Sequence, residues 1–105
     1  GGITAVRPAE ALPTVLALGR NHPNPFNPQT LISYSVPADQ HVELAVFDVR
    51  GQRIRTLVRD VMPAGNHDAT WMGEDDHGRQ VASGMYFYRL TTDGQSLVGK
   101  MLLVK

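Results

Sequence analysis

The chain has 105 residues, of which 42% are hydrophobic and 19% are charged. A chain of this length is expected to be one domain, or a fragment of a larger protein, with one modest core. Ten lysines and arginines balance ten aspartates and glutamates. The net charge of zero argues against a nucleic-acid partner, because such binding needs clustered positive charge. The absence of cysteine excludes disulfides and zinc–thiolate sites, and no apolar run approaches the roughly 20 residues that cross a bilayer as a helix.

Residues 1–19 are expected to form a linker or leader ahead of a domain that spans residues 20–105. Pro8 and Pro13 interrupt any helix in the leader, because proline lacks the backbone donor that a helix interior needs. Val15–Leu18 predicts an edge strand. A helix over Ala9–Ala17 is the alternative, and Pro13 counts against it.

Residues 21–28 are unusually rich in asparagine and proline, with the sequence Asn-His-Pro-Asn-Pro-Phe-Asn-Pro. Each residue before a proline is restricted to extended conformations, and asparagine side chains fold onto nearby backbone groups in turns. The stretch therefore predicts a stiff, irregular loop in which Phe26 is the one large apolar anchor.

From residue 31 onward, apolar and polar residues alternate with a period of two, which is typical of half-buried strands. Two such strands are predicted at Leu31–Val36 and His41–Phe47. Their apolar faces contain Ile32, Tyr34, Val36, Val42, Leu44 and Val46. Arg53–Val61 predicts a further strand, and its alternation is blurred near Leu57 and Val58, which indicates a β-bulge.

The second half of the chain predicts three more strands. They lie at residues 67–71, Met85–Thr92 and Leu97–Val104. Gly73–Gln80 is expected to be a polar loop, and Asp93-Gly94 is a strong hairpin turn signal. About seven short strands separated by regular turns predict an all-β fold, namely an immunoglobulin-like or fibronectin III-like antiparallel β-sandwich.

Four aromatic residues near the end of the chain raise the alternative of a carbohydrate-binding module. They are Trp71, Tyr86, Phe87 and Tyr88. Strand alternation puts the two tyrosines on one face and Phe87 on the other, so only one set can be exposed. We expect Trp71 and Phe87 to fill the core and the tyrosines to pack laterally.

The one local excess of positive charge is a group of arginines. It consists of Arg50, Arg53, Arg55 and Arg59. On a regular strand the last three share one face and form a basic stripe. The simpler interpretation is a solvated face near Glu43 or Asp60, and contact with anionic lipopolysaccharide is the alternative.

No constellation of residues predicts catalysis, so we expect no enzyme and no cofactor. The four histidines are scattered, at His22, His41, His67 and His77. Ser83 does not lie in a Gly-x-Ser-x-Gly elbow. The acidic loop at residues 74–77 has carboxylates that suit calcium but lacks the spacing of an EF-hand. We therefore expect a structural turn and no metal there.

Ordered motifs along most of the chain carry a family resemblance. They are Asn21 to Pro28; Thr30, Ile32, Tyr34 and Pro37; Val42, Leu44, Val46, Asp48 and Gly51; Ala64-Gly65-x-His67; Trp71-x-Gly73-x-Asp75 and Gly78; Val81-x-Ser83-Gly84; Tyr86-Phe87-x-x-Leu90; and Lys100 to Lys105. In this order they resemble the type A C-terminal sorting domains of the type IX secretion system. The pattern is also similar to the immunoglobulin-like domain of flagellar hook-capping proteins, and it covers residues 18–105.

The resemblance implies a non-catalytic domain that directs a larger exported bacterial protein to the cell surface. Its partners are then an outer-membrane translocon with its sorting machinery and the covalently attached upstream passenger. The expected location is secreted or at the cell surface, reached through the periplasm. A carbohydrate-binding or adhesion module of an exported enzyme is the alternative, which adds a polysaccharide to the expected partners. A structural assembly domain like that of the hook-capping proteins is less favoured.

The resemblance also implies three groups of site residues. The recognition loop consists of Asn21, Pro23, Asn24, Pro25, Phe26, Asn27 and Pro28. The terminal strand signal consists of Lys100, Met101, Leu102, Leu103, Val104 and Lys105. A structural turn uses Asp75, Gly78 and Gly84. Within the loop, our hypothesis is that Asn24, Phe26 and Asn27 carry a recognition surface for the translocon. The alternatives are a purely structural corner and an edge strand whose lysines discourage pairing.

Overall fold

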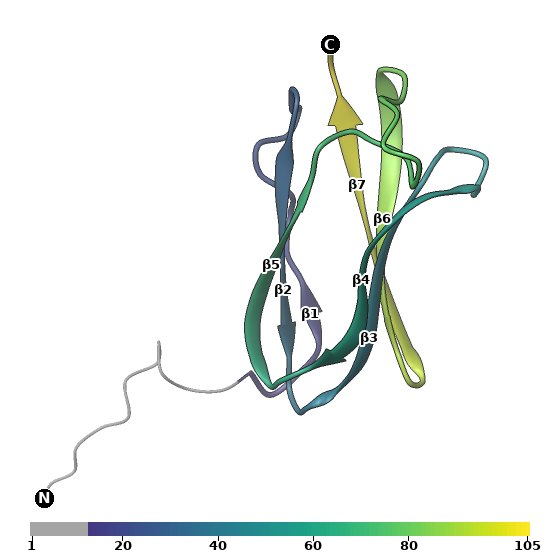
Figure 1. Ribbon diagram of the computed structural model, residues 1–105. Coiled ribbons are helices and arrows are strands. Elements are labelled where there is room, and N and C mark those ends of the chain that lie inside the picture. The colour runs from purple at the N-terminus through teal and green to yellow at the C-terminus, as the bar shows by residue number, and fades with distance from the viewer. Residues whose placement is uncertain (1–12) are drawn as a thin grey trace, which may run out of the picture.

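Seven β-strands make up the fold of the computed structural model, which describes residues 13–105 (Figure 1). The strands are β1 (Ala17–Leu18), β2 (Thr30–Val36), β3 (Gln40–Phe47), β4 (Arg53–Met62), β5 (Gly65–Trp71), β6 (Gly84–Thr92) and β7 (Gln95–Leu103). The predicted strands are all present, with ends that differ by one or two residues. The described residues include no helix, and therefore no apolar helix long enough to cross a membrane.

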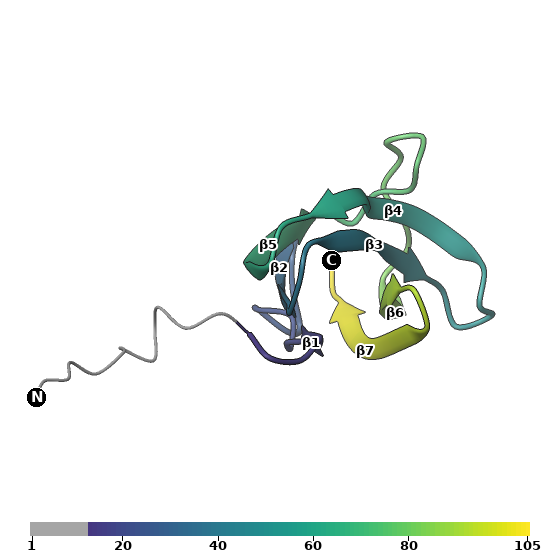
Figure 2. The same cartoon turned by 90° about the horizontal axis from the view of Figure 1, so that it is seen from below.

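The strands form two antiparallel sheets that face each other across one core. One sheet has the order β1-β2-β5 and the other has the order β4-β3-β6-β7. Figure 2 shows the two sheets curving around the interior. The edge strands β4 and β5 lie in contact on one side of the sandwich, and β1 and β7 lie in contact on the other. This confirms the predicted all-β, immunoglobulin-like sandwich of seven strands.

The core is built from the alternating apolar positions of both sheets. The positions predicted on β2 and β3 are buried, with Ile32, Val36, Val42, Leu44 and Val46 fully enclosed. Complete burial of each such side chain contributes about 1.5–3 kcal/mol. The period-two pattern therefore predicted the inner face of these two strands correctly.

On β6 the inner face is the opposite of the one expected. Tyr86, Tyr88 and Leu90 are buried, whereas Phe87 points to the outer face and is only half-buried. The tyrosines can be buried because each hydroxyl finds a carbonyl acceptor, that of Tyr86 on Ala82 at 2.6 Å. Trp71 is buried as expected and packs edge-on against Tyr86, with ring centroids 5.2 Å apart.

The start of the described chain belongs to the sandwich. Ala17 and Leu18 pair with β2, and Leu16 is buried in the core. The predicted edge strand is present but shorter than Val15–Leu18. Because Ala17 is extended, the alternative helix is wrong for its described part. The rest of that helix and most of the predicted leader lie outside the described residues.

The predicted bulge on β4 is confirmed. Leu44 pairs with Val58 and Ala45 with Thr56, so Leu57 is the extra residue. A second irregularity follows at Ile54, and nothing in the alternation of the sequence indicated it. Each extra residue reverses which face the following side chains occupy.

Tyr88 and Gly99 form a close contact between β6 and β7, where they are direct partners. The ring of Tyr88 lies over Gly99 so closely that a Cβ atom on Gly99 would come within 2.3 Å of the ring. Backbone atoms of a strand are rarely this close to an aromatic ring unless the facing residue is glycine. The hydroxyl of Tyr88 then reaches across the sandwich and donates to the carbonyl of Gly19 at 2.9 Å.

We predict that Gly99→Ala destabilises the domain by about 1–3 kcal/mol, because the added methyl group overpacks the ring. That loss exceeds the gain of about 0.5–1 kcal/mol that alanine normally has over glycine in a strand. Urea unfolding measures the effect, and the control repeats the substitution in a Tyr88→Leu background. There the ring is gone, so Gly99→Ala should cost little. An equal loss in both backgrounds would contradict this contact.

Candidate functional site

The proline-rich loop is hydrogen-bonded to the end of β7. The amide of Phe26 donates to the carbonyl of Leu102, and the amide of Val104 donates to the carbonyl of Phe26, both at 3.0 Å. The side chain of Asn24 adds a third bond, accepting from the amide of Leu102 at 3.0 Å. The recognition loop and the terminal strand, which the sequence analysis treated as separate signals, therefore form one surface. We call residues 21–28 together with residues 100–105 the loop–strand site.

Phe26 anchors this site from inside the protein. Its side chain is 2% exposed, and its ring packs against Trp71 with centroids 5.6 Å apart. The expectation of an apolar anchor is confirmed, but a partner cannot touch this side chain in the folded domain. In the hypothesis that Asn24, Phe26 and Asn27 carry the recognition surface, the part of Phe26 is therefore to hold the loop in place. Asn24 and Asn27 remain exposed.

A buried polar network holds the loop in shape. Asn21 Nδ2 donates to Thr30 Oγ1 at 3.1 Å, and Thr30 Oγ1 donates to the carbonyl of Pro23 at 2.8 Å. The amide of Asn21 donates to the Tyr88 hydroxyl at 3.1 Å. Burial raises the pKa of Tyr88, so this hydroxyl stays neutral at physiological pH. Sequence reasoning missed Tyr88 as a loop support because it lies 67 residues from Asn21. It missed Thr30 although its partners Asn21 and Pro23 are close in the chain, because the period-two pattern does not show where a hydroxyl donates.

The last strand divides its side chains between the core and the surface. Met101 and Leu103 are buried. The exposed members are Lys100, Leu102, Val104 and Lys105. Only this second group is available to a partner of the folded domain.

The backbone of β7 presents an open edge beside the loop. Leu102 uses both its amide and its carbonyl toward the loop, and in an antiparallel ladder alternate residues face the same way. The backbone amide and carbonyl groups of Val98 and Lys100 therefore face away from β6. In the described chain, β7 pairs with no strand other than β6. Val98 and Lys100 border an open groove of about 400 Å³, whose far wall is Leu18 to Asn21.

The predicted structural turn has the geometry of a tight, side-chain-capped turn. Asp75 Oδ1 accepts from the amides of His77 and Arg79 at 2.9 and 3.0 Å. These two bonds, that from Arg79 first, lower the pKa of Asp75. Gly78, within this turn, has φ +79°, a region that favours glycine. Gly84 lies outside the turn as the first residue of β6, with φ +150°. Across residues 13–105, no three histidine or acidic side chains are grouped to hold a metal ion.

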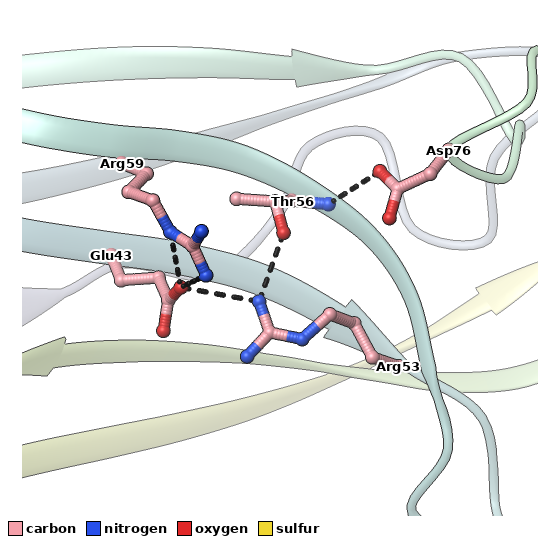
Figure 3. Close-up of polar contacts among 5 residues, drawn as sticks. All are labelled: Glu43, Arg53, Thr56, Arg59 and Asp76. Atoms are coloured by element: carbon pink, nitrogen blue, oxygen red, sulfur yellow. Dashed lines mark hydrogen bonds and ion pairs between the residues drawn. The ribbon is translucent and has the colours of Figure 1, made fainter.

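The expected basic stripe is broken and partly neutralised. Glu43 Oε2 accepts from Arg53 at 3.2 Å and from Arg59 at 2.8 Å (Figure 3). Arg55 lies elsewhere, because the irregularity at Ile54 separates it from Arg53, and it donates to the carbonyl of Asp75. The prediction of three arginines on one face is therefore wrong. The simpler interpretation, a solvated face near Glu43, is confirmed for the other two.

A pH dependence follows from this cluster. Hydrogen bonds from Arg53 and then Arg59 lower the pKa of Glu43 below its ordinary value of 4.5. A carboxylate whose pKa is lower in the folded state stabilises the fold above its ordinary pKa and loses this contribution as the pH falls through the folded value.

We therefore expect Glu43→Gln to destabilise the domain by up to about 1 kcal/mol at pH 7, as is usual for exposed ion pairs. Urea unfolding from pH 7 to pH 3 should show the full difference above pH 4.5 and a shrinking one below it. Added salt should reduce the difference at pH 7, because it screens exposed charges. A difference that grows toward acid pH would contradict the assignment.

Known proteins resemble this chain both in sequence and in fold. Residues 28–96 match the family of FlgD Ig-like domains. The dimeric latent PorU of Porphyromonas gingivalis has a similar fold, with 20% identity and a TM-score of 0.69 over 90% of this chain and 10% of that chain. FlgD from P. aeruginosa is 23% identical, with a TM-score of 0.57 over 70% of this chain and 60% of that chain.

PorZ, described as an essential bacterial surface component of the type-IX secretion system of P. gingivalis, is 18% identical. Its TM-score is 0.52, over 86% of this chain and 11% of that chain. No protein with curated annotation matches the sequence. At these identities the structural matches show a shared fold, and this chain spans only about a tenth of PorU and PorZ. Since residues 28–96 are well over half of the chain, the protein belongs to the FlgD Ig-like domain family.

Proposed function

We propose that this domain directs the export, and the surface sorting or anchoring, of a larger secreted bacterial protein to which it is covalently joined. The domain acts by binding and carries out no catalysis. Its partners are an outer-membrane translocon and the associated sorting machinery. Its route runs through the periplasm, and it ends secreted or at the cell surface.

The observation that carries the proposal is the loop–strand site. Three hydrogen bonds at 3.0 Å hold the loop on the end of the chain, two at Leu102 in β7 and one at Val104 just after it. The buried Phe26 and Asn21 hold the loop from below. A surface that is ordered before binding loses little conformational entropy when a partner arrives. Two segments that the sequence resemblance marks as signals thus form a preorganised unit that one partner can read at once.

The open edge of β7 supplies the mode of recognition in this proposal. An extended segment of the translocon pairs with the free amide and carbonyl groups of Val98 and Lys100, as in strand addition. Asn24 and Asn27, exposed on the neighbouring loop, then provide specificity. The likeness in fold to PorU and PorZ supports a role in type IX secretion without testing it.

A structural assembly role is the second candidate, favoured by the match to FlgD Ig-like domains. That match covers residues 28–96, so it leaves out most of the loop–strand site. A domain whose only task is assembly has no need of a signal in those outer residues. Export of a reporter therefore separates the two candidates.

The experiment fuses the 105-residue chain to the end of a periplasmically targeted reporter in a bacterium with a type IX system. We predict that Asn24→Ala combined with Asn27→Ala reduces reporter export at least about tenfold, which corresponds to about 1.4 kcal/mol of binding. Phe26→Ala is unsuitable, because emptying its core position costs about 3–5 kcal/mol and unfolds the signal.

The matched control is Asn66→Ala, which removes an exposed asparagine from β5, away from the loop. It should leave export unchanged. Thermal unfolding of the purified variants verifies that each is folded. If the folded loop variant is exported like the original chain, the loop is not the signal. If the unaltered fusion is retained in the cell, the export function itself is refuted and the assembly role gains support.

A further inference from the structure

The outer face of the four-stranded sheet carries one continuous row of aromatic and basic residues. Arg53 pairs with Phe47, Phe47 with Phe87, and Phe87 with Lys100, so the row crosses all four strands. Arg89 lies beside it, with its guanidinium carbon 4.4 Å above the ring of Phe47. None of these residues belongs to the loop–strand site except Lys100.

Apolar side chains surround this row instead of the usual polar ones. Val49 and Val98 are 66% and 62% exposed, and the paired residues Met85 and Leu102 are 39% and 36% exposed. Val49, Val98 and Phe87 line a shallow hollow of about 230 Å³ together with Arg89. Clustered exposed apolar residues of this kind mark a surface that contacts something else.

The cations on this face differ in how they are paired. Arg53 and Arg59 share the carboxylate of Glu43. Within residues 13–105, no carboxylate lies at ion-pair distance from Arg89 or Lys100. Asp48 also lines the hollow, but its Oδ1 accepts two backbone amides of its own turn and its Oδ2 lies 3.9 Å from Nε of Arg50. Among the described residues, this face therefore presents two cations that form no ion pair, beside exposed hydrocarbon.

We propose that this outer face docks onto an anionic lipid bilayer surface. Arg89 and Lys100 contact the headgroup phosphates, while Val49, Val98 and Leu102 enter the boundary between headgroups and acyl chains. A carbohydrate is a poorer fit, because a guanidinium already covers the ring of Phe47 on which a sugar would stack. An acidic peptide would use the cations but would leave most of the exposed valine and leucine surface in water.

This inference does not depend on the export proposal. The sequence analysis considered contact between an arginine stripe and anionic lipopolysaccharide. The docking face proposed here uses Arg89 and Lys100, which lie on the same sheet, in place of that stripe. The exposed β-sheet face is broad and has only a shallow hollow, which suits a bilayer better than a single small molecule. The contact of the Arg89 guanidinium with the ring of Phe47 holds this cation on the outer face, and its N–H donors suit a phosphate.

The test is co-sedimentation of the 105-residue chain with vesicles of phosphatidylcholine alone or with one third phosphatidylglycerol, at low and high salt. Binding is expected only with the anionic lipid, and salt should weaken it. Arg89→Gln should reduce the partition constant about fivefold, the loss expected for one basic residue near an anionic membrane. The control Arg59→Gln changes the net charge equally but removes an arginine already paired with Glu43, so its loss should be clearly smaller.

A second matched pair tests the apolar contact. Val98→Ser should weaken vesicle binding severalfold, since it removes exposed hydrocarbon from the docking face. Val61→Ser is the control, because Val61 is 61% exposed on β4 and lies far from the row of aromatic residues. Equal losses for Arg89→Gln and Arg59→Gln would show attraction by net charge alone and would overturn the proposal. So would binding to soluble acidic peptide or dextran sulfate without binding to anionic vesicles.

Discussion

The structure depends most on the backbone pairing of Phe26 with the end of β7. This residue donates one hydrogen bond to Leu102 of the last strand and accepts another from Val104, just after that strand, while its ring is enclosed in the core against Trp71. A loop that precedes the first long strand is thereby joined to the final strand, across 78 residues in the case of Asn24 and Leu102. Either segment alone would leave backbone groups and apolar surface without partners.

A second connection supports the same side of the sandwich. Tyr88 rises from β6 over Gly99 and bonds to Gly19, so the short strand β1 is held against the sheet that contains β7. This explains why the groove beside the loop has one wall from each sheet. The recognition surface that we propose is thus supported by buried aromatic and polar contacts and by the exposed Asn24, which accepts from the amide of Leu102. Residues such as Asn27 are free to serve binding.

Much of the fold could be predicted from local patterns. Alternation predicted the inner faces of β2 and β3, and its interruption predicted the bulge at Leu57. It failed on β6, because a period of two defines two faces without saying which is buried. Both tyrosines are buried with carbonyl partners: Tyr86 bonds to the nearby Ala82, and Tyr88 bonds to Gly19, 69 residues away. It failed for Arg55 because the irregularity at Ile54 leaves no local mark. The joining of loop and last strand was also beyond local reasoning, although the family resemblance had pointed to both segments.

The central claim is that the loop and the last strand form one ordered unit, and amide hydrogen exchange tests it most directly. The amides of Leu102 and Val104 bond to the loop, whereas the amide of Val98, on the same edge of the same strand, has no partner in the described chain. Exchange at Leu102 and Val104 should be as slow as in β6 and far slower than at Val98. If all three amides exchange equally fast, the loop is not held on the strand and the account is contradicted.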